Sequence, residues 1–230
     1  MVERVSFGIR AFDKLIGGGV IRPSAILLLG DIGAGKTVMC QQFIWNGLKN
    51  GESGIYFCID HSPDAVRENM AGFGWDIKPF EEKGDLILVD SFLSRKWESN
   101  EKHVIEDPFN FEQHVMAWNL LDRFENKPIR LVYDSLSSIT YMETFESILR
   151  FLRDLHGVIL NKNCTGLISS VRGVHEKKLE ITMQQTLGNV FKLKKEGAKI
   201  FLIIEKMEAT KHHQKPIQIV VVDAGVVMLQ

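Results

Sequence analysis

Residues 30–37 read Gly30-Asp31-Ile32-Gly33-Ala34-Gly35-Lys36-Thr37, which matches the phosphate-loop pattern G-x-x-x-x-G-K-[ST]. An apolar run at 25–29 precedes this stretch, and a helical pattern begins at Thr37 and Val38 and continues to Lys49. Glycines let successive backbone N–H groups curve around phosphate oxygens, while the helix directs its positive end toward the anion. The stretch therefore predicts an anion-binding strand–loop–helix unit over residues 30–38. The competing interpretation is a glycine-rich turn with an incidental Lys-Thr pair.

Two side chains of this pattern carry specific chemistry. Lys36 is placed to reach the β- and γ-phosphates of a nucleotide, and Thr37 to offer its hydroxyl to Mg²⁺. Such a site also needs a carboxylate at the end of a neighbouring strand to hold the metal's waters. Asp134 is the candidate, because it ends the apolar run at 129–133 and parallel strands open their ligand sites at the carboxyl edge. Arg130 interrupts that run, which leaves the alternative that Asp134 is an ordinary strand-end residue.

Strand-like and helical patterns alternate along the chain. Most of the strand-like runs are short, apolar and unalternating, which is typical of parallel strands covered by helices on both faces. They lie at 25–29, 54–59, 86–89, 129–133, 165–169, 200–204 and 217–222. Helical spacing appears at 37–49, 62–73, 107–124 and 144–161. We therefore predict an α/β fold, a P-loop core with a mostly parallel central sheet flanked by helices and a C-terminal antiparallel β-ribbon. The charged stretch 93–107 is predicted to be an exposed loop that could carry a binding function.

The composition limits the classes of function. The chain has 230 residues, 45% of them hydrophobic and 25% charged, which fits one globular domain over residues 1–230. Its net charge of -1 argues against a generalist polyanion binder, because such affinity depends on clustered Lys and Arg. Cys40, Cys58 and Cys164 lie in apolar segments and are predicted to be buried thiols. The apolar stretches are shorter than the about 20 residues of a membrane span, and the N-terminus is charged, so we expect a cytoplasmic protein without a span.

Several motifs together resemble the KaiC-like domains of the RecA superfamily. They are the opening Arg4-Val5 with Gly8-Ile9 and 12–20, the loop at 30–37, Gln42-Phe43-Ile44, and Lys206-Met207 followed by Thr210 and His212. Val222-Asp223-Ala224-Gly225-Val226 resembles the closing hairpin of the family. The resemblance implies a single domain that binds ATP or ADP with Mg²⁺. It further implies a homo-oligomeric ring, commonly a hexamer, in which Lys206 of one subunit reaches the nucleotide of the next.

The sequence departs from the family at the position of its catalytic glutamate pair, which reads Asp60-His61. An Asp carboxylate is one methylene shorter than Glu, and errors of about 1 Å can cost ~100-fold in rate. Asp60 is therefore expected to be a slow base for the attacking water, and His61, whose unperturbed pKa is about 6.5, is a second candidate. The alternative is that Asp60 and His61 only cap the helix that starts near Pro63.

A second departure concerns the residues that act across subunits. Glu208 and Ala209 stand where the family has Arg and Gly. Since such arginines are worth about 10³–10⁵ in rate, a partial loss of catalysis follows. The alternative is that the ribbon is shifted and that Lys206, Lys211 or His212 supplies the charge.

Three functions are compatible with these residues. The first is a Mg-ATP-dependent ring-forming switch with weak ATP hydrolysis that acts on an unidentified protein partner. The second is a catalytically impaired nucleotide-binding scaffold, for which Asp60-His61 and Glu208 argue. The third is a RecA-like DNA-binding ATPase; the net charge of -1 disfavours it, although the lysines at 177–178, 192–199 and 211–215 could form local basic surfaces.

Overall fold

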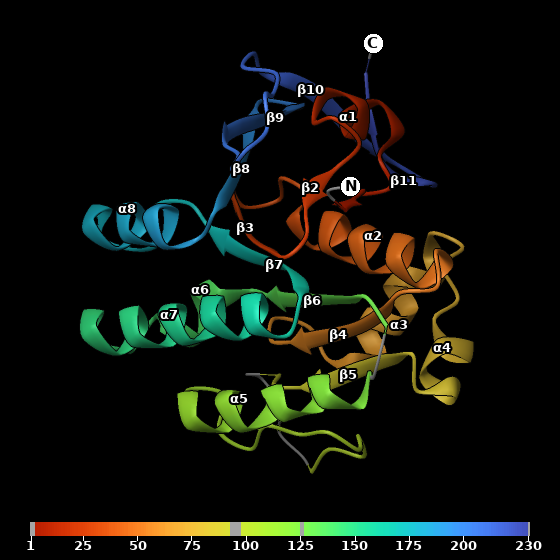
Figure 1. The fold of residues 1–230 in the computed structure, drawn as a ribbon, viewed down its shortest axis with the longest axis vertical. Coiled ribbons are helices and arrows are strands. Elements are labelled where there is room, and N and C mark those ends of the chain that lie inside the picture. The colour runs from red at the N-terminus through yellow and green to blue at the C-terminus, as the bar shows by residue number, and fades with distance from the viewer. Residues whose placement is uncertain (1–2, 93–97, 125–126, 230) are drawn as a thin grey trace.

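The computed structural model describes residues 3–92, 98–124 and 127–229. Its main sheet has the strand order β11-β10-β9-β8-β3-β7-β6-β4-β5 (Figure 1). In chain order these strands are β3 (Ser24–Gly30), β4 (Ser53–Cys58), β5 (Leu86–Asp90), β6 (Ile129–Asp134), β7 (Cys164–Val171), β8 (Asn189–Glu196), β9 (Lys199–Lys206), β10 (Ile217–Val222) and β11 (Gly225–Met228). The strands from β8 to β5 pair in parallel, and β9, β10 and β11 add antiparallel pairs. The predicted α/β fold with a mostly parallel sheet and a C-terminal ribbon is confirmed.

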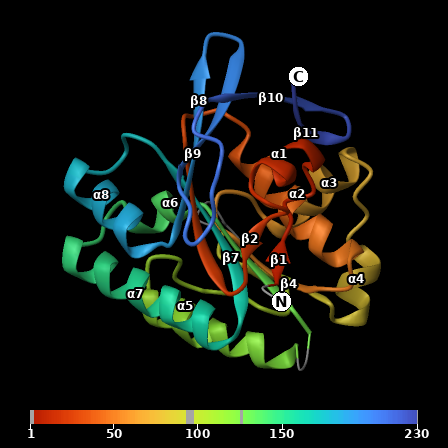
Figure 2. The same cartoon turned by 45° about the horizontal axis from the view of Figure 1, so that its top comes forward.

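Helices cover both faces of this sheet (Figure 2). They are α1 (Arg10–Leu15), α2 (Lys36–Lys49), α3 (Pro63–Gly72), α4 (Lys78–Lys83), α5 (Phe111–Ala117), the 3-10 helix η1 (Trp118–Arg123), α6 (Leu136–Thr140), α7 (Phe145–Asn161) and α8 (Lys177–Thr186). One core joins α2 and α3 to the sheet, and a second core joins α7 and α8 to the opposite face. Every residue of β3, β4, β5 and β6 is buried, so these strands are covered on both faces, as the sequence predicts.

Local signals explain most helix boundaries, and one prediction was wrong. Ser62 and Thr144 accept backbone hydrogen bonds at the starts of α3 and α7, close to the predicted limits. The helix predicted over 107–124 instead begins at Phe111, because the Asn110 side chain caps it, and it tightens to 3-10 geometry at Trp118. The helix α8 was not predicted, because its buried face has two residues, Leu179 and Met183.

The predicted loop at 93–107 lies partly outside the described residues, which omit 93–97. Its described part forms a parallel bridge between Asp90 and Val104, and Glu101 pairs with Arg67. The three cysteines are buried and unpaired, as predicted. Within the described ranges, no helix combines the length and apolar character that crossing a membrane requires.

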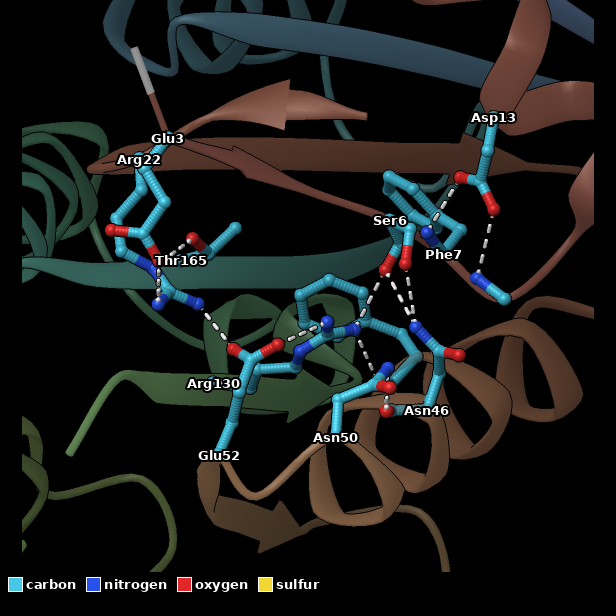
Figure 3. Close-up of polar contacts among 12 residues, drawn as sticks. Glu3, Ser6, Phe7, Asp13, Arg22, Asn46, Asn50, Glu52, Arg130 and Thr165 are labelled. Carbon is cyan, nitrogen blue, oxygen red and sulfur yellow. Dashed lines mark hydrogen bonds and ion pairs between the residues drawn. The ribbon is translucent and has the colours of Figure 1, made fainter. Parts of the chain in front are cut away.

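A buried ionic network fixes the N-terminal segment to the sheet (Figure 3). Arg130 on β6 donates to the backbone oxygens of Ser6 and Phe43 at 2.8 and 2.7 Å and pairs with Glu52 at 2.6 Å. Glu52 also pairs with Arg22. Although Arg130 interrupts an apolar strand, it is 1% exposed, and both of its terminal nitrogens are hydrogen-bonded. The N-terminal segment is therefore held against α2 and β6.

Candidate functional site

The glycine loop, residues 30–37, connects the central strand β3 to α2 at the carboxyl edge of the sheet. Gly33 and Gly35 have φ angles of 70° and 84°, in the region that favours glycine. Gly30 lies so close to β8 that a Cβ there would stand 2.9 Å from Cβ of Leu193. Ile32 is at the tip of the loop and is 80% exposed. The predicted strand–loop–helix unit is therefore present, with its glycines where the backbone geometry requires them.

Lys36 is the first residue of α2, and its side chain folds back to the start of the loop. Its Nζ donates to the carbonyl oxygens of Gly30 and Asp31 at 3.1 and 3.0 Å. Burial lowers the pKa of Lys36, while the nearby carboxylate of Asp134 raises it and opposes this effect. The Lys36 ammonium thus lies within the loop, where an incoming anion would offer it better acceptors than two carbonyls.

Asp134 ends β6 and is 3% exposed. It accepts hydrogen bonds from Tyr56 Oη at 2.9 Å and from Ser169 Oγ at 2.7 Å. Burial raises the pKa of Asp134, and hydrogen bonds from Ser169, Tyr56 and Thr37 partly offset the rise. Since burial disfavours the charge of this carboxylate, a cation beside it would be stabilising, and Thr37 is near enough to lower the pKa of Asp134. These two residues fit the donor set that a hard divalent cation requires.

Asp60 and His61 follow β4 at the same edge of the sheet. The backbone N–H groups of Ile59 and Asp60 donate to the carbonyl oxygen of Asp134 at 3.2 and 3.1 Å, which brings the predicted base beside the predicted metal ligand. Asp60 is exposed and His61 half-buried. The cap of α3 is Ser62, whose Oγ accepts from Ala65 N at 3.3 Å. Helix capping therefore does not account for Asp60 and His61.

Sequence reasoning missed two serines that hold Asp60. Ser135 Oγ donates to one carboxylate oxygen at 2.8 Å, and Ser138 Oγ donates to the other at 2.5 Å. Both oxygens of the candidate base are thus hydrogen-bonded, so an attacking water would have to compete with the two serine hydroxyls for them. The two serines stand one and four residues after Asp134, and this spacing around the start of α6 is the signal that could have found them.

Lys206 and Glu208 lie elsewhere in this chain. Lys206 is the last residue of β9, and its Nζ donates to the carbonyl oxygens of Gln184 and Leu187 at 3.4 and 3.3 Å, near the end of α8. The carboxylate of Glu208 packs against Gly188. The structure therefore brings together Lys36, Thr37, Asp60 and Asp134, but it does not bring Lys206 to them within one chain.

Asp31 anchors the loop rather than lining it. Its carboxylate accepts from Arg172 Nε at 2.9 Å and from the backbone N–H of Lys195 at 2.8 Å. Two backbone hydrogen bonds add to this anchor, from Arg172 N to the Gly30 oxygen and from Asp31 N to the Leu193 oxygen, each 3.0 Å long. The loop is thus fixed to the ends of β7 and β8, a role for Arg172 and Lys195 that the sequence did not indicate.

A glycine loop between a buried central strand and a helix, in a mostly parallel sheet with an antiparallel extension, defines a RecA-type P-loop ATPase fold. The family model described as "ATPase: KaiC" matches residues 5–230. A UPF0273 protein of Pyrococcus horikoshii is 32% identical over 235 residues, covering 99% of this chain and 94% of that protein. A UPF0273 protein of Thermotoga maritima is 30% identical, covering 99% and 96%. The chain therefore belongs to the KaiC ATPase family.

A solved structure agrees with this assignment. The crystal structure of a KaiC-like protein from Pyrococcus horikoshii superposes with a TM-score of 0.82 at 26% sequence identity, covering 100% of both chains. The resemblance inferred from the sequence is confirmed over nearly the whole chain, and the family implies nucleotide binding.

Proposed function

We propose that this chain, as a single RecA-type domain, binds Mg-ATP at the glycine loop and works as a ring-forming switch with weak ATP hydrolysis. The observation that supports this most strongly is the convergence of Lys36, Thr37 and the buried Asp134 at one edge of the sheet. Residues 30–38, from Gly30 to Val38, would surround the phosphates with backbone N–H groups at the positive end of α2. Lys36 would exchange its two carbonyl acceptors for phosphate oxygens.

The metal would be held between Thr37 and Asp134. Bound there, Mg²⁺ would neutralise charge on the phosphates. Asp134 is fixed in place by Tyr56 and Ser169, so it would orient the water shell of the metal without rearranging. Burial raises the pKa of Asp134, which shows that its charged form is destabilised. A cation bound beside it would stabilise the charged form and lower that pKa.

Weak hydrolysis follows from the state of Asp60. The Ser135 and Ser138 hydroxyls occupy its two oxygens, and its side chain is one methylene shorter than Glu. Both effects lower the rate at which Asp60 accepts a proton from an attacking water. His61 is the second candidate base. The contacts of Asp60 equally favour the alternative of a nucleotide-binding scaffold that has lost turnover.

The resemblance to KaiC-like domains, which implies a ring, supports assembly as a homo-oligomer, with a hexameric ring as the proposed form. In such a ring Lys206 would act on the nucleotide of the adjacent subunit, since it lies away from the glycine loop of its own chain. The proposed output is a nucleotide-dependent surface that a protein partner binds.

One experiment tests these proposals together. Light scattering after size-exclusion chromatography, with and without Mg-ATP, is followed by phosphate-release assays on the same fractions. We expect a larger mass with Mg-ATP and slow phosphate release, and we expect both to disappear in Lys36→Ala. Assembly without release above that of Lys36→Ala would establish the scaffold instead. Equal masses and equal release for the two proteins under all conditions would refute the proposal.

A further inference from the structure

The strand β8 carries three lysines beside the glycine loop, and their positions differ. Lys192 pairs with Glu205 at 3.1 Å and Lys194 pairs with Glu196 at 2.7 Å. Lys195 has no carboxylate partner among the residues that the structure describes. Its ammonium group is therefore available for a ligand, whereas those of its two neighbours are engaged.

Strand geometry places Lys195 on the face of the sheet from which the loop leads into α2. Side chains alternate between the two faces of a strand, so Lys195 shares a face with Phe191 and Leu193, while Lys192 and Lys194 share the other. Phe191 and Leu193 pack in the core that contains the α2 residues Met39 and Phe43. Lys195 is thus the one lysine of these three on the side of the loop and α2.

The Lys195 ammonium lies beside the loop. A Cβ atom built on Gly33 would lie 3.5 Å from Lys195 Nζ, so the ammonium group stands beside the middle of the loop. The backbone of Lys195 is fixed beside the loop, because its N–H donates to the Asp31 carboxylate. The same carboxylate holds Arg172 through Nε, so Arg172 is already neutralised while Lys195 is not.

We propose that Lys195 is a second phosphate-binding lysine, supplied by the same chain as the loop, and that it contacts the terminal phosphate of a nucleoside triphosphate. This inference rests on the proposed nucleotide binding at the glycine loop and adds a specificity-determining residue to it. An exposed lysine beside a glycine-rich loop places positive charge where a triphosphate carries additional negative charge. It therefore favours the triphosphate over the diphosphate. In the family, an arginine of the neighbouring subunit supplies positive charge to this site, and Glu208 stands at its position here. Lys195 would supply positive charge from the same chain instead.

Calorimetric titration of the full chain with Mg-ATP and Mg-ADP tests this role. We expect Lys195→Ala to weaken Mg-ATP binding about tenfold, and Mg-ADP binding less than threefold, as for a lost charge-assisted contact to the third phosphate. Lys194→Ala is the matched control, because it removes the adjacent charge on the opposite face, and it should leave both affinities within twofold. Lys195→Arg, which keeps the charge, should retain most of the preference for ATP. Thermal unfolding without nucleotide should be unchanged in Lys195→Ala.

The outcomes separate this inference from the function on which it rests. If the wild-type chain and Lys36→Ala both bind neither nucleotide, the proposed function fails and the inference with it. If the wild-type chain binds both nucleotides but Lys195→Ala loses equal affinity for each, or none, the assignment of Lys195 alone is overturned. An equal loss in Lys194→Ala would show a general effect of surface charge and would also overturn it.

Discussion

Replacing Gly47 by alanine should destabilise the protein, although alanine is the better helix former. Gly47 lies near the end of α2, where a Cβ atom would stand 2.5 Å from Cδ of the buried Arg130 and also overlap Nε. Helix propensity alone favours Ala over Gly by about 1 kcal/mol. The clash, however, displaces a guanidinium that donates to Ser6, Phe43 and Glu52, and each bond to a charged group is worth about 1.5–3 kcal/mol.

Losing one to two of these bonds outweighs the gain in propensity, so we expect Gly47→Ala to lower the free energy of unfolding by about 2 kcal/mol. That corresponds to a drop in Tm of about 4–8 °C for a chain of this size, measured by circular dichroism. The matched control is Gly157→Ala near the end of α7, where a Cβ would meet nothing within 4 Å, and which should raise Tm. If both variants raise Tm, Arg130 does not hold the position against α2 that the structure gives it.

Two further predictions concern carboxylates. Burial raises the pKa of Asp13 to about 6, so its contribution to stability is full below about pH 4 and is lost as pH rises through 6. The stability of the wild type relative to Asp13→Asn should therefore fall by up to about 3 kcal/mol between pH 4 and pH 7 in urea unfolding, and a constant difference would contradict this. Asp60→Glu restores the missing methylene and should raise phosphate release by up to ~100-fold; a slower variant would show that Asp60 does not face the attacking water.

The sequence was sufficient to place the main parts of the candidate site. Unalternating apolar runs predicted parallel strands buried on both faces, and the rule that such strands share a carboxyl edge brought Asp134 to the glycine loop. Asp60 was found differently, through the resemblance to KaiC-like domains, and the structure places it after β4 at the same edge. The position of Asp134 needed local pattern and topology alone, so it could be predicted without knowledge of side-chain positions.

Other features depend on residues that meet only after folding. Asp31 belongs to the loop pattern, yet its partners Arg172 and Lys195 lie at the ends of two other strands. The register of β7 and β8 against β3 brings them to Asp31, and that register cannot be read from the sequence pattern. Likewise, α8 buries two side chains, so its apolar periodicity is too weak to predict a helix. The burial of Arg130 in a strand could not be predicted either, because its partners come from distant segments. They are Glu52 and the carbonyl oxygens of Ser6 and Phe43.

The anchors of the glycine loop restrict how a bound nucleotide could change this protein. Arg172, Leu193 and the Asp31 carboxylate fix the loop to β7 and β8, so binding costs little ordering and moves the loop little. A ligand shifts a conformational equilibrium only through contacts that differ between states. The groups that would change partners are Lys36, which donates to the loop carbonyls, and Thr37, which lowers the pKa of Asp134. The Asp134 carbonyl oxygen also accepts from the backbone N–H of Asp60. We therefore expect a nucleotide-dependent conformational change to involve β6 and the segment after β4 rather than the loop itself.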